Sequence, residues 1–188
     1  MNWKFVESYT EASDFSIYLK EIETPNIPSE IHTGLDVGNN IGITTINYKN
    51  ESDAQNVVIR TNGGTLNVDA EKDTINHYGN SEKVVITAVA GESFHENGEV
   101  NGNIEIQSGR IEIAKDAKVD SVLVTGNDVK VEFCDETAST TIMVSDAVDN
   151  DKQPEVIGKE FNAEENKIKL VNSYAELKTA IYSFGGKI

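Results

Sequence analysis

Short runs of alternating apolar and polar residues dominate the chain from about residue 41 to 145. In one run, Ile111 and Ile113 alternate with Arg110 and Glu112, which is the period of a β-strand with one buried face. The runs are separated by Gly, Asn, Asp and Ser, and a helical period is absent there. The pattern predicts strands at residues 43–48, 57–60, 65–68, 74–78, 84–87, 103–106, 110–113, 122–124, 129–133 and 141–144.

A repeat within these runs distinguishes two architectures, because evenly spaced short strands suit an antiparallel sandwich as well as a parallel solenoid. Four apolar positions, Ile104, Ile106, Ile111 and Ile113, recur eighteen residues later as Val122, Val124, Val129 and Val131. The same offset places Glu112 against Lys130 on the outer face. We therefore expect an all-β fold, a right-handed parallel β-helix of a few coils with three short strands per coil.

The two ends of the chain differ from this middle. Residues 1–40 are expected to form an N-terminal capping segment of one or two strands that closes the first coil, and residues 41–145 the β-helix itself. Residues 146–188 are expected to hold a polar linker and then an amphipathic helix. Ser173 and Glu176 form a capping box there. The apolar stripe of that helix consists of Tyr174, Leu177, Ile181 and Phe184.

Composition excludes several functions. Acidic residues outnumber basic ones 32 to 16, so a nucleic-acid partner is not expected. No run of 18 apolar residues occurs, so membrane insertion is not expected either. The single cysteine, Cys134, forms no internal disulfide and is interpreted as a small core residue. The first seven residues lack an apolar region, so we expect a cytosolic protein or one whose export signal has been removed.

Candidate metal ligands do not follow a known spacing. The histidines, His32, His77 and His95, lack the close spacing of a zinc site, and we expect His77 and His95 to close turns through backbone hydrogen bonds. One short segment contains several oxygen ligands of the kind that calcium prefers, at Asp146, Asp149, Asn150 and Asp151. However, Gln153 and Pro154 occupy the region where an EF-hand loop would turn. The sequence predicts no metal and no cofactor.

Candidate catalytic groups are equally dispersed. Glycoside hydrolysis needs two carboxylates at a defined separation, and 32 acidic residues supply many accidental pairs. Glu105, Glu112 and Glu132 alternate outward on predicted strands and are interpreted as solubilising charge. Neither a phosphate-binding loop nor a nucleophile elbow is visible. We therefore predict no catalytic residues.

Four segments of the chain resemble a known family. The chain is similar to the pectate-lyase-like right-handed β-helix modules of large exported surface proteins of Gram-positive bacteria. The resemblance is carried by residues 74–79 (TINHYG), 84–90 (VVITAVA), 93–98 (SFHENG) and 108–111 (SGRI). In addition, residues 171–181 followed by 185–188 look like the cap that opens a further β-helix.

This resemblance is more specific for the fold than for an enzymatic activity. The family's lyases are implied to use aspartates around calcium and a basic residue on one sheet face. Here Arg60 and Arg110 fall on different repeated strands without a neighbouring aspartate pair. We therefore expect no enzyme but an extracellular or cell-surface structural or adhesive module of a larger protein, whose partner would be a cell-wall or host polysaccharide or a protein.

Two other functions stay open. One is a carbohydrate-binding or degenerate polysaccharide-lyase-like domain, which would need an aromatic platform. The aromatic residues Tyr48, Tyr78, Phe94 and Phe133 are scattered over different strands. The other is a piece of a homo-oligomeric assembly, joined through a coil end.

Overall fold

The computed structural model describes residues 13–19, 43–51, 54, 56–59, 62–90, 94–170 and 176 of the chain. Within them, strands alternate between two parallel sheets. The eight-stranded sheet holds β1 (Ser13–Leu19), β2 (Ile43–Asn50), β4 (Asn62–Ala70), β6 (Asn80–Val89), β8 (Glu99–Ile106), β10 (Lys118–Val124), β12 (Thr141–Ser145) and β14 (Lys167–Ile168). The six-stranded sheet holds β3 (Asn56–Ile59), β5 (Thr74–His77), β7 (Phe94–Glu96), β9 (Arg110–Ile113), β11 (Lys130–Phe133) and β13 (Glu155–Ile157).

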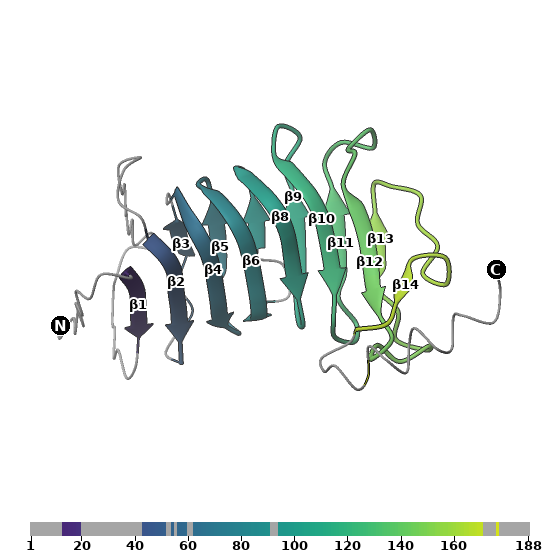
Figure 1. Ribbon diagram of the computed structural model, residues 1–188, viewed down its shortest axis with the longest axis horizontal. Coiled ribbons are helices and arrows are strands. Elements are labelled where there is room, and N and C mark those ends of the chain that lie inside the picture. Colours follow the sequence, from purple (N-terminus) through teal and green to yellow (C-terminus); the bar gives the residue numbers. More distant parts are fainter. Residues whose placement is uncertain are drawn as a thin grey trace.

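The expected parallel solenoid is confirmed. From β2 onward the chain passes from one sheet to the other at each corner, and each strand lies beside the strand of the same sheet one coil earlier. About six coils result, stacked along the long axis of the molecule (Figure 1). β13 and β14 continue the two sheets beyond Ser145, into the segment for which the sequence predicted a linker.

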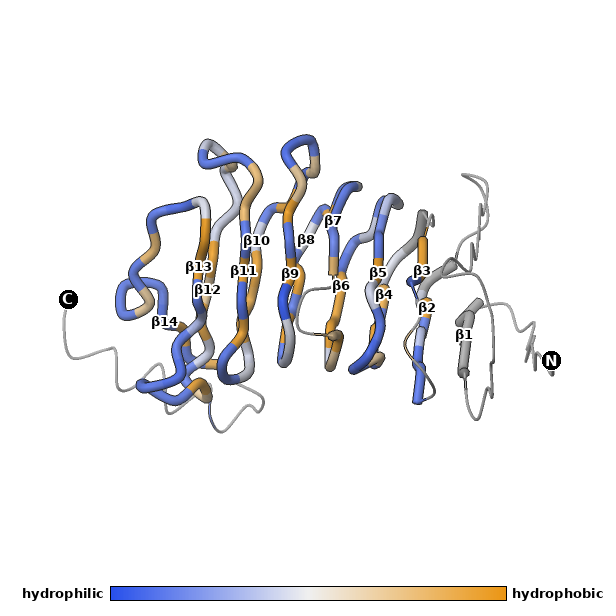
Figure 2. The backbone as a smooth tube through the Cα atoms, turned by 180° about the vertical axis from the view of Figure 1, so that it is seen from behind, coloured by the Kyte–Doolittle hydropathy of each residue, from blue (hydrophilic) through white to orange (hydrophobic). Residues whose placement is uncertain are grey.

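The interior of the solenoid is filled by ladders of aliphatic side chains. One ladder runs through Leu66, Val84, Ile104, Val122 and Ile142, each at most 4% exposed. Figure 2 shows apolar positions recurring on strand after strand. Fully burying one such side chain is worth about 1.5–3 kcal/mol. The core therefore grows by a similar amount with every coil.

The structure has two strands per coil where the sequence predicted three. The residues of the third short strand do pair between coils, but they form the first part of a longer strand of the eight-stranded sheet. Val119 pairs with Val100, the register then shifts, and Ser121 pairs with Asn103 in the same two strands. A bulge therefore bends β8 and β10 within one sheet, whereas a full corner would have started a third sheet.

Between the two coils from which it was derived, the predicted offset of eighteen holds in the eight-stranded sheet only. Val122 lies opposite Ile104, eighteen residues away, as expected. In the other sheet Val131 lies opposite Ile111, twenty residues away, so the predicted pairing of Ile111 with Val129 is wrong. The corner after β10 is two residues longer than the corner after β8 and contains Asp128 in the left-handed region, at φ 57°.

The described parts of the two chain ends bear on the expected capping segment and the expected C-terminal helix. β1 lies within the predicted capping segment 1–40 and pairs with β2. The predicted helix at 173–184 lies outside the described residues except for Glu176, which is helical and exposed. The sequence also missed β7, a strand of three residues.

Candidate functional site

The outer face of the six-stranded sheet carries a row of ion pairs between successive coils. We call it the charged row, and it consists of His95, Arg110, Glu112, Lys130, Glu132 and Glu155. Nδ1 of His95 lies 3.4 Å from Oε1 of Glu112. Arg110 pairs with Glu132, and Nζ of Lys130 lies 2.8 Å from Oε2 of Glu155. Every basic side chain of the row thus has a carboxylate partner one coil further on.

The register makes Glu112 and Lys130 diagonal neighbours, where the sequence predicted direct partners; Glu112 contacts His95 and Lys130 binds Glu155. Glu132 is the Cα partner of Glu112, and Lys130 is the Cα partner of Arg110. Direct pairing would therefore place two positive charges opposite each other at one position and two negative charges opposite each other at the next outward position. Diagonal pairing of Arg110 with Glu132 avoids both repulsions, because side chains two residues apart on neighbouring strands are still within reach.

Cys134 lies beside the charged row, and the prediction that it is a core residue is wrong. Phe133 points inward, so the next side chain points outward, and Cys134 is exposed. Desolvation, together with the Glu112 carboxylate, raises the pKa of the thiol above its ordinary value. A raised pKa favours the protonated thiol, which is a poorer nucleophile than the thiolate.

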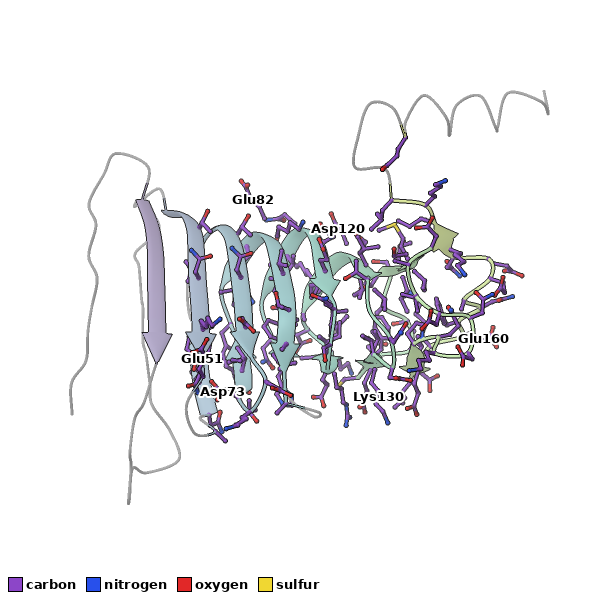
Figure 3. The ribbon with its side chains drawn as sticks, turned by 90° about the horizontal axis from the view of Figure 1, so that it is seen from below. Glu51, Asp73, Glu82, Asp120, Lys130 and Glu160 are labelled. Carbon is purple, nitrogen blue, oxygen red and sulfur yellow. The ribbon has the colours of Figure 1, made fainter. Side chains whose placement is uncertain are left out.

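Two of the three glutamates considered as glycosidase carboxylates, Glu112 and Glu132, are Cα partners on neighbouring strands, and the third does not join them. Glu105 lies on the eight-stranded sheet and binds Nζ of Lys83 at 2.9 Å. Glu112 and Glu132 lie on the other sheet, where Glu112 contacts His95 and Glu132 pairs with Arg110. Figure 3 shows charged side chains around the ribbon, with Glu82 and Lys130 on opposite sides in this view. These carboxylates are structural partners of neighbouring basic residues.

A buried polar cluster that the sequence did not predict lies between β5, β6 and β7. Nδ1 of His77 lies 2.7 Å from Oε2 of Glu96, and Nε2 of His77 lies 3.3 Å from Oγ of Ser81. The backbone N–H of Gly98 donates to the other oxygen of Glu96 at 2.7 Å. A serine, a histidine and a carboxylate in this order resemble a hydrolytic triad. All three are at most 2% exposed, so a substrate has no access to them.

His77 therefore differs from its expected role. The sequence predicted a backbone hydrogen bond that closes a turn, and the side chain instead binds Glu96, nineteen residues later. One coil separates the two residues, and this spacing was the only signal in the sequence that could have found the pair. His95 also binds a side chain, that of Glu112. His32 lies outside the described residues, as does Arg60.

A second buried cluster joins the first coils. The hydroxyl of Tyr48 donates to Oδ2 of Asp73 at 2.5 Å, and Nδ2 of Asn50 donates to Oδ1 of Asp73 at 2.7 Å. Asp73 is 0% exposed. Burial, followed by the hydrogen bond and the charge of Asp73, raises the pKa of Tyr48 far above its ordinary value. Both clusters include contacts between residues about one coil apart in the sequence.

The acidic segment considered for calcium does not converge on one point. Asp149 exchanges two hydrogen bonds with Asn127, at 2.8 and 3.0 Å. Asn150 accepts a hydrogen bond from Nζ of Lys167 at 2.6 Å. Within the part of the chain that the structure describes, no group of three or more His, Cys, Asp and Glu side chains is arranged to hold a metal ion.

Two open hollows lie on the surface. The larger, of about 670 Å³, is lined by Glu136, Gly158, Lys159 and Glu160. Its lysine donates to the carbonyl oxygens of Ala138 and Thr140, at 2.8 and 2.5 Å. The smaller, of about 410 Å³, runs from the C-terminal part of β6 along the corners after β8, β10 and β12. We call it the corner groove, and it is lined by Thr87, Gln107, Ser108, Thr125, Gly126, Asn127 and Ala147, all of which are uncharged.

No family model, no curated protein and no solved structure matches the chain. Among the described residues, no helix is both long and apolar enough to span a membrane.

Proposed function

We propose that the chain is a non-enzymatic structural or adhesive module, extracellular or displayed on a cell surface within a larger bacterial protein of the pectate-lyase-like kind. The observation that carries the proposal is that its polar side chains are used to join coils. The charged row connects β7, β9, β11 and β13, and both buried clusters connect residues of different coils. A stack joined in this way suits a stiff spacer, in which each repeat contacts its neighbours.

The corner groove favours a second candidate, carbohydrate binding. Thr87, Gln107 and Ser108 are exposed, and they offer hydroxyl and amide groups on successive coils about 4.8 Å apart. An uncharged lining on a chain of net charge −16 would accept a neutral polymer without electrostatic cost. The residues that line the corner groove include no aromatic platform, and Tyr48, Phe94 and Phe133 are buried.

Two measurements on the same preparation separate these functions. Small-angle scattering should give an elongated particle whose dimensions do not change with ionic strength, and a compact or variable particle would contradict the spacer. A glycan array, read with calcium and with chelator, tests binding. Signal for one polysaccharide class that Gln107→Ala abolishes and Thr141→Val, an exposed control on β12, retains would promote the second candidate.

A further inference from the structure

The first part of β8 contains a bulge that neither neighbouring strand matches. Val100 is the Cα partner of Ser81 on β6 and of Val119 on β10, and the register then shifts on both sides. Asn101 and Gly102 fall within that shift and have no Cα partner on either of these two described strands. A bulge residue is left out of the ladder, so its backbone is less constrained than that of a paired residue.

The second residue of this bulge has to be glycine. A Cβ built on Gly102 would lie 2.4 Å from the carbonyl oxygen of Glu82 in the preceding coil. The residue before it, Asn101, is exposed. The fold therefore places a glycine directly after an exposed asparagine, and a residue without a Cβ hinders attack by its own backbone nitrogen least.

We propose that Asn101 is a site of spontaneous deamidation, at which water converts the asparagine into aspartate and isoaspartate. The backbone nitrogen of Gly102 loses its proton and attacks Cγ of Asn101. A new N–Cγ bond forms, and the side-chain nitrogen leaves as ammonia. Water then opens the cyclic succinimide at one carbonyl to give aspartate, or at the other to give isoaspartate. Solvent water is the only co-reactant, and no group is oxidised or reduced.

A second Asn-Gly pair, four residues earlier, has the opposite environment. The backbone N–H of Gly98 donates to Oε1 of the buried Glu96 at 2.7 Å, and Nδ2 of Asn97 donates to the carbonyl oxygen of His95 at 3.0 Å. The attacking nitrogen must first give up its bond to a carboxylate, which lowers the rate by a factor of at least about 10. The fold thus protects Asn97 and leaves Asn101 reactive.

Deamidation changes the charge of one row of side chains. Ser81 and its Cα partners on β8 and β10 are buried, so the residue that follows each of them points outward. These outward residues are Glu82, Asn101 and Asp120, and all three are exposed. Figure 3 shows Glu82 and Asp120 on the same side of the ribbon. The neutral amide separates two acidic residues, and its loss places like charges on three successive coils, which is destabilising.

Mass spectrometry of the unaltered full-length chain tests the proposal. The folded protein is incubated at mildly alkaline pH, and cleavage after Glu99 then places Asn97 and Asn101 in separate peptides. Deamidation at Asn101 should be at least about 10 times faster than at Asn97. In concentrated urea, where the fold holds neither pair, the two rates should become similar. Enzymatic methylation that is specific for isoaspartate identifies the rearranged product.

The other outcomes overturn the proposal. Equal rates at the two asparagines of the folded chain would mean that the bulge does not favour the reaction. A ratio that persists in urea would assign the difference to the local sequence and not to the fold. Asn101→Gln keeps the amide and should abolish the product at this position. Asn101→Asp, which imitates one product, should lower the midpoint of denaturant unfolding relative to Asn101→Gln, and equal midpoints would contradict the expected repulsion.

Discussion

Two interior positions hold polar residues where the adjacent coils hold aliphatic ones. His77 stacks on Ile59 of the preceding coil, and Glu96 lies under Ile113 of the next. The pair is fully buried, so each partner compensates the desolvation of the other. Removing one partner from a buried pair costs about 3–5 kcal/mol, whereas replacing both by apolar residues is often close to neutral.

We therefore expect Glu96→Ile and His77→Ile each to lower the free energy of unfolding by about 3–5 kcal/mol. The double variant should lose less than either single variant, because an uninterrupted apolar ladder then runs from Ile59 to Phe133. Denaturant unfolding of the four proteins in a double-mutant cycle measures this. Additive losses would show that the two side chains do not depend on each other.

Tyr48 makes the stability of the solenoid decrease at alkaline pH. Its pKa is raised above the ordinary value of 10.0, so the folded state holds the phenolic proton more tightly than the unfolded chain does. The contribution is complete below about pH 10. It falls above that pH by about 1.4 kcal/mol per pH unit, because the unfolded chain alone loses the proton.

Unfolding measured between pH 9 and 11.5 should show this decline, and Tyr48→Phe should remove it while lowering stability at pH 8. Tyr78→Phe changes a residue that is 43% exposed and should retain the decline. Identical pH profiles for the Tyr48→Phe variant and the unaltered protein would refute the role of the buried phenol.

At the scale of the element, the faces of the strands are predictable from sequence and their partners are not. Alternation assigns Ile111, Val131 and Phe133 to the interior, and they are buried. A corner that is longer by two residues leaves every side chain on the same face, because the strand period is two. The extra residues near Asp128 therefore left no trace in the hydrophobic pattern but changed the partner of Glu112.

The candidate site depends on those partners, which is why less of it could be predicted. The inward and outward pattern could not show that Arg110 meets Glu132 or that His77 meets Glu96, since both contacts depend on the length of each coil. Nor could it show that a bulge near Val119 would merge two short strands into one. Corners accept insertions at little cost in free energy, so the sequence constrains their length weakly.

The close stacking of corners can be tested at Gly126. A Cβ built on this residue would lie 1.9 Å from the carbonyl oxygen of Gln107 in the preceding coil. Backbone lies on that side, so the corner has to shift, and Gly126→Ala should cost about 1–3 kcal/mol. Ser108→Ala, an exposed change in the neighbouring corner, serves as the control. Equal unfolding midpoints for the two variants would mean that the corners are not in close contact.

At the scale of the whole molecule, a stack of coils spreads a local defect differently from a globular core. Ile104 contacts Val84 and Val122 on the two adjacent coils of its sheet, and it is 0% exposed. Ile104→Ala should cost about 2–5 kcal/mol. Each coil is stabilised mainly by its neighbours, so this loss should be concentrated around β6, β8 and β10.

Hydrogen exchange followed by mass spectrometry can locate that loss. In the Ile104→Ala variant, amide protection should fall most in β6, β8 and β10 and least in β2 and β12, which lie two or more strands away from β8. Equal loss of protection in every strand would mean that the solenoid opens as one cooperative unit. A spacer that confines a defect to a few coils would keep the remainder of its length rigid, and this property is what the proposed structural function requires.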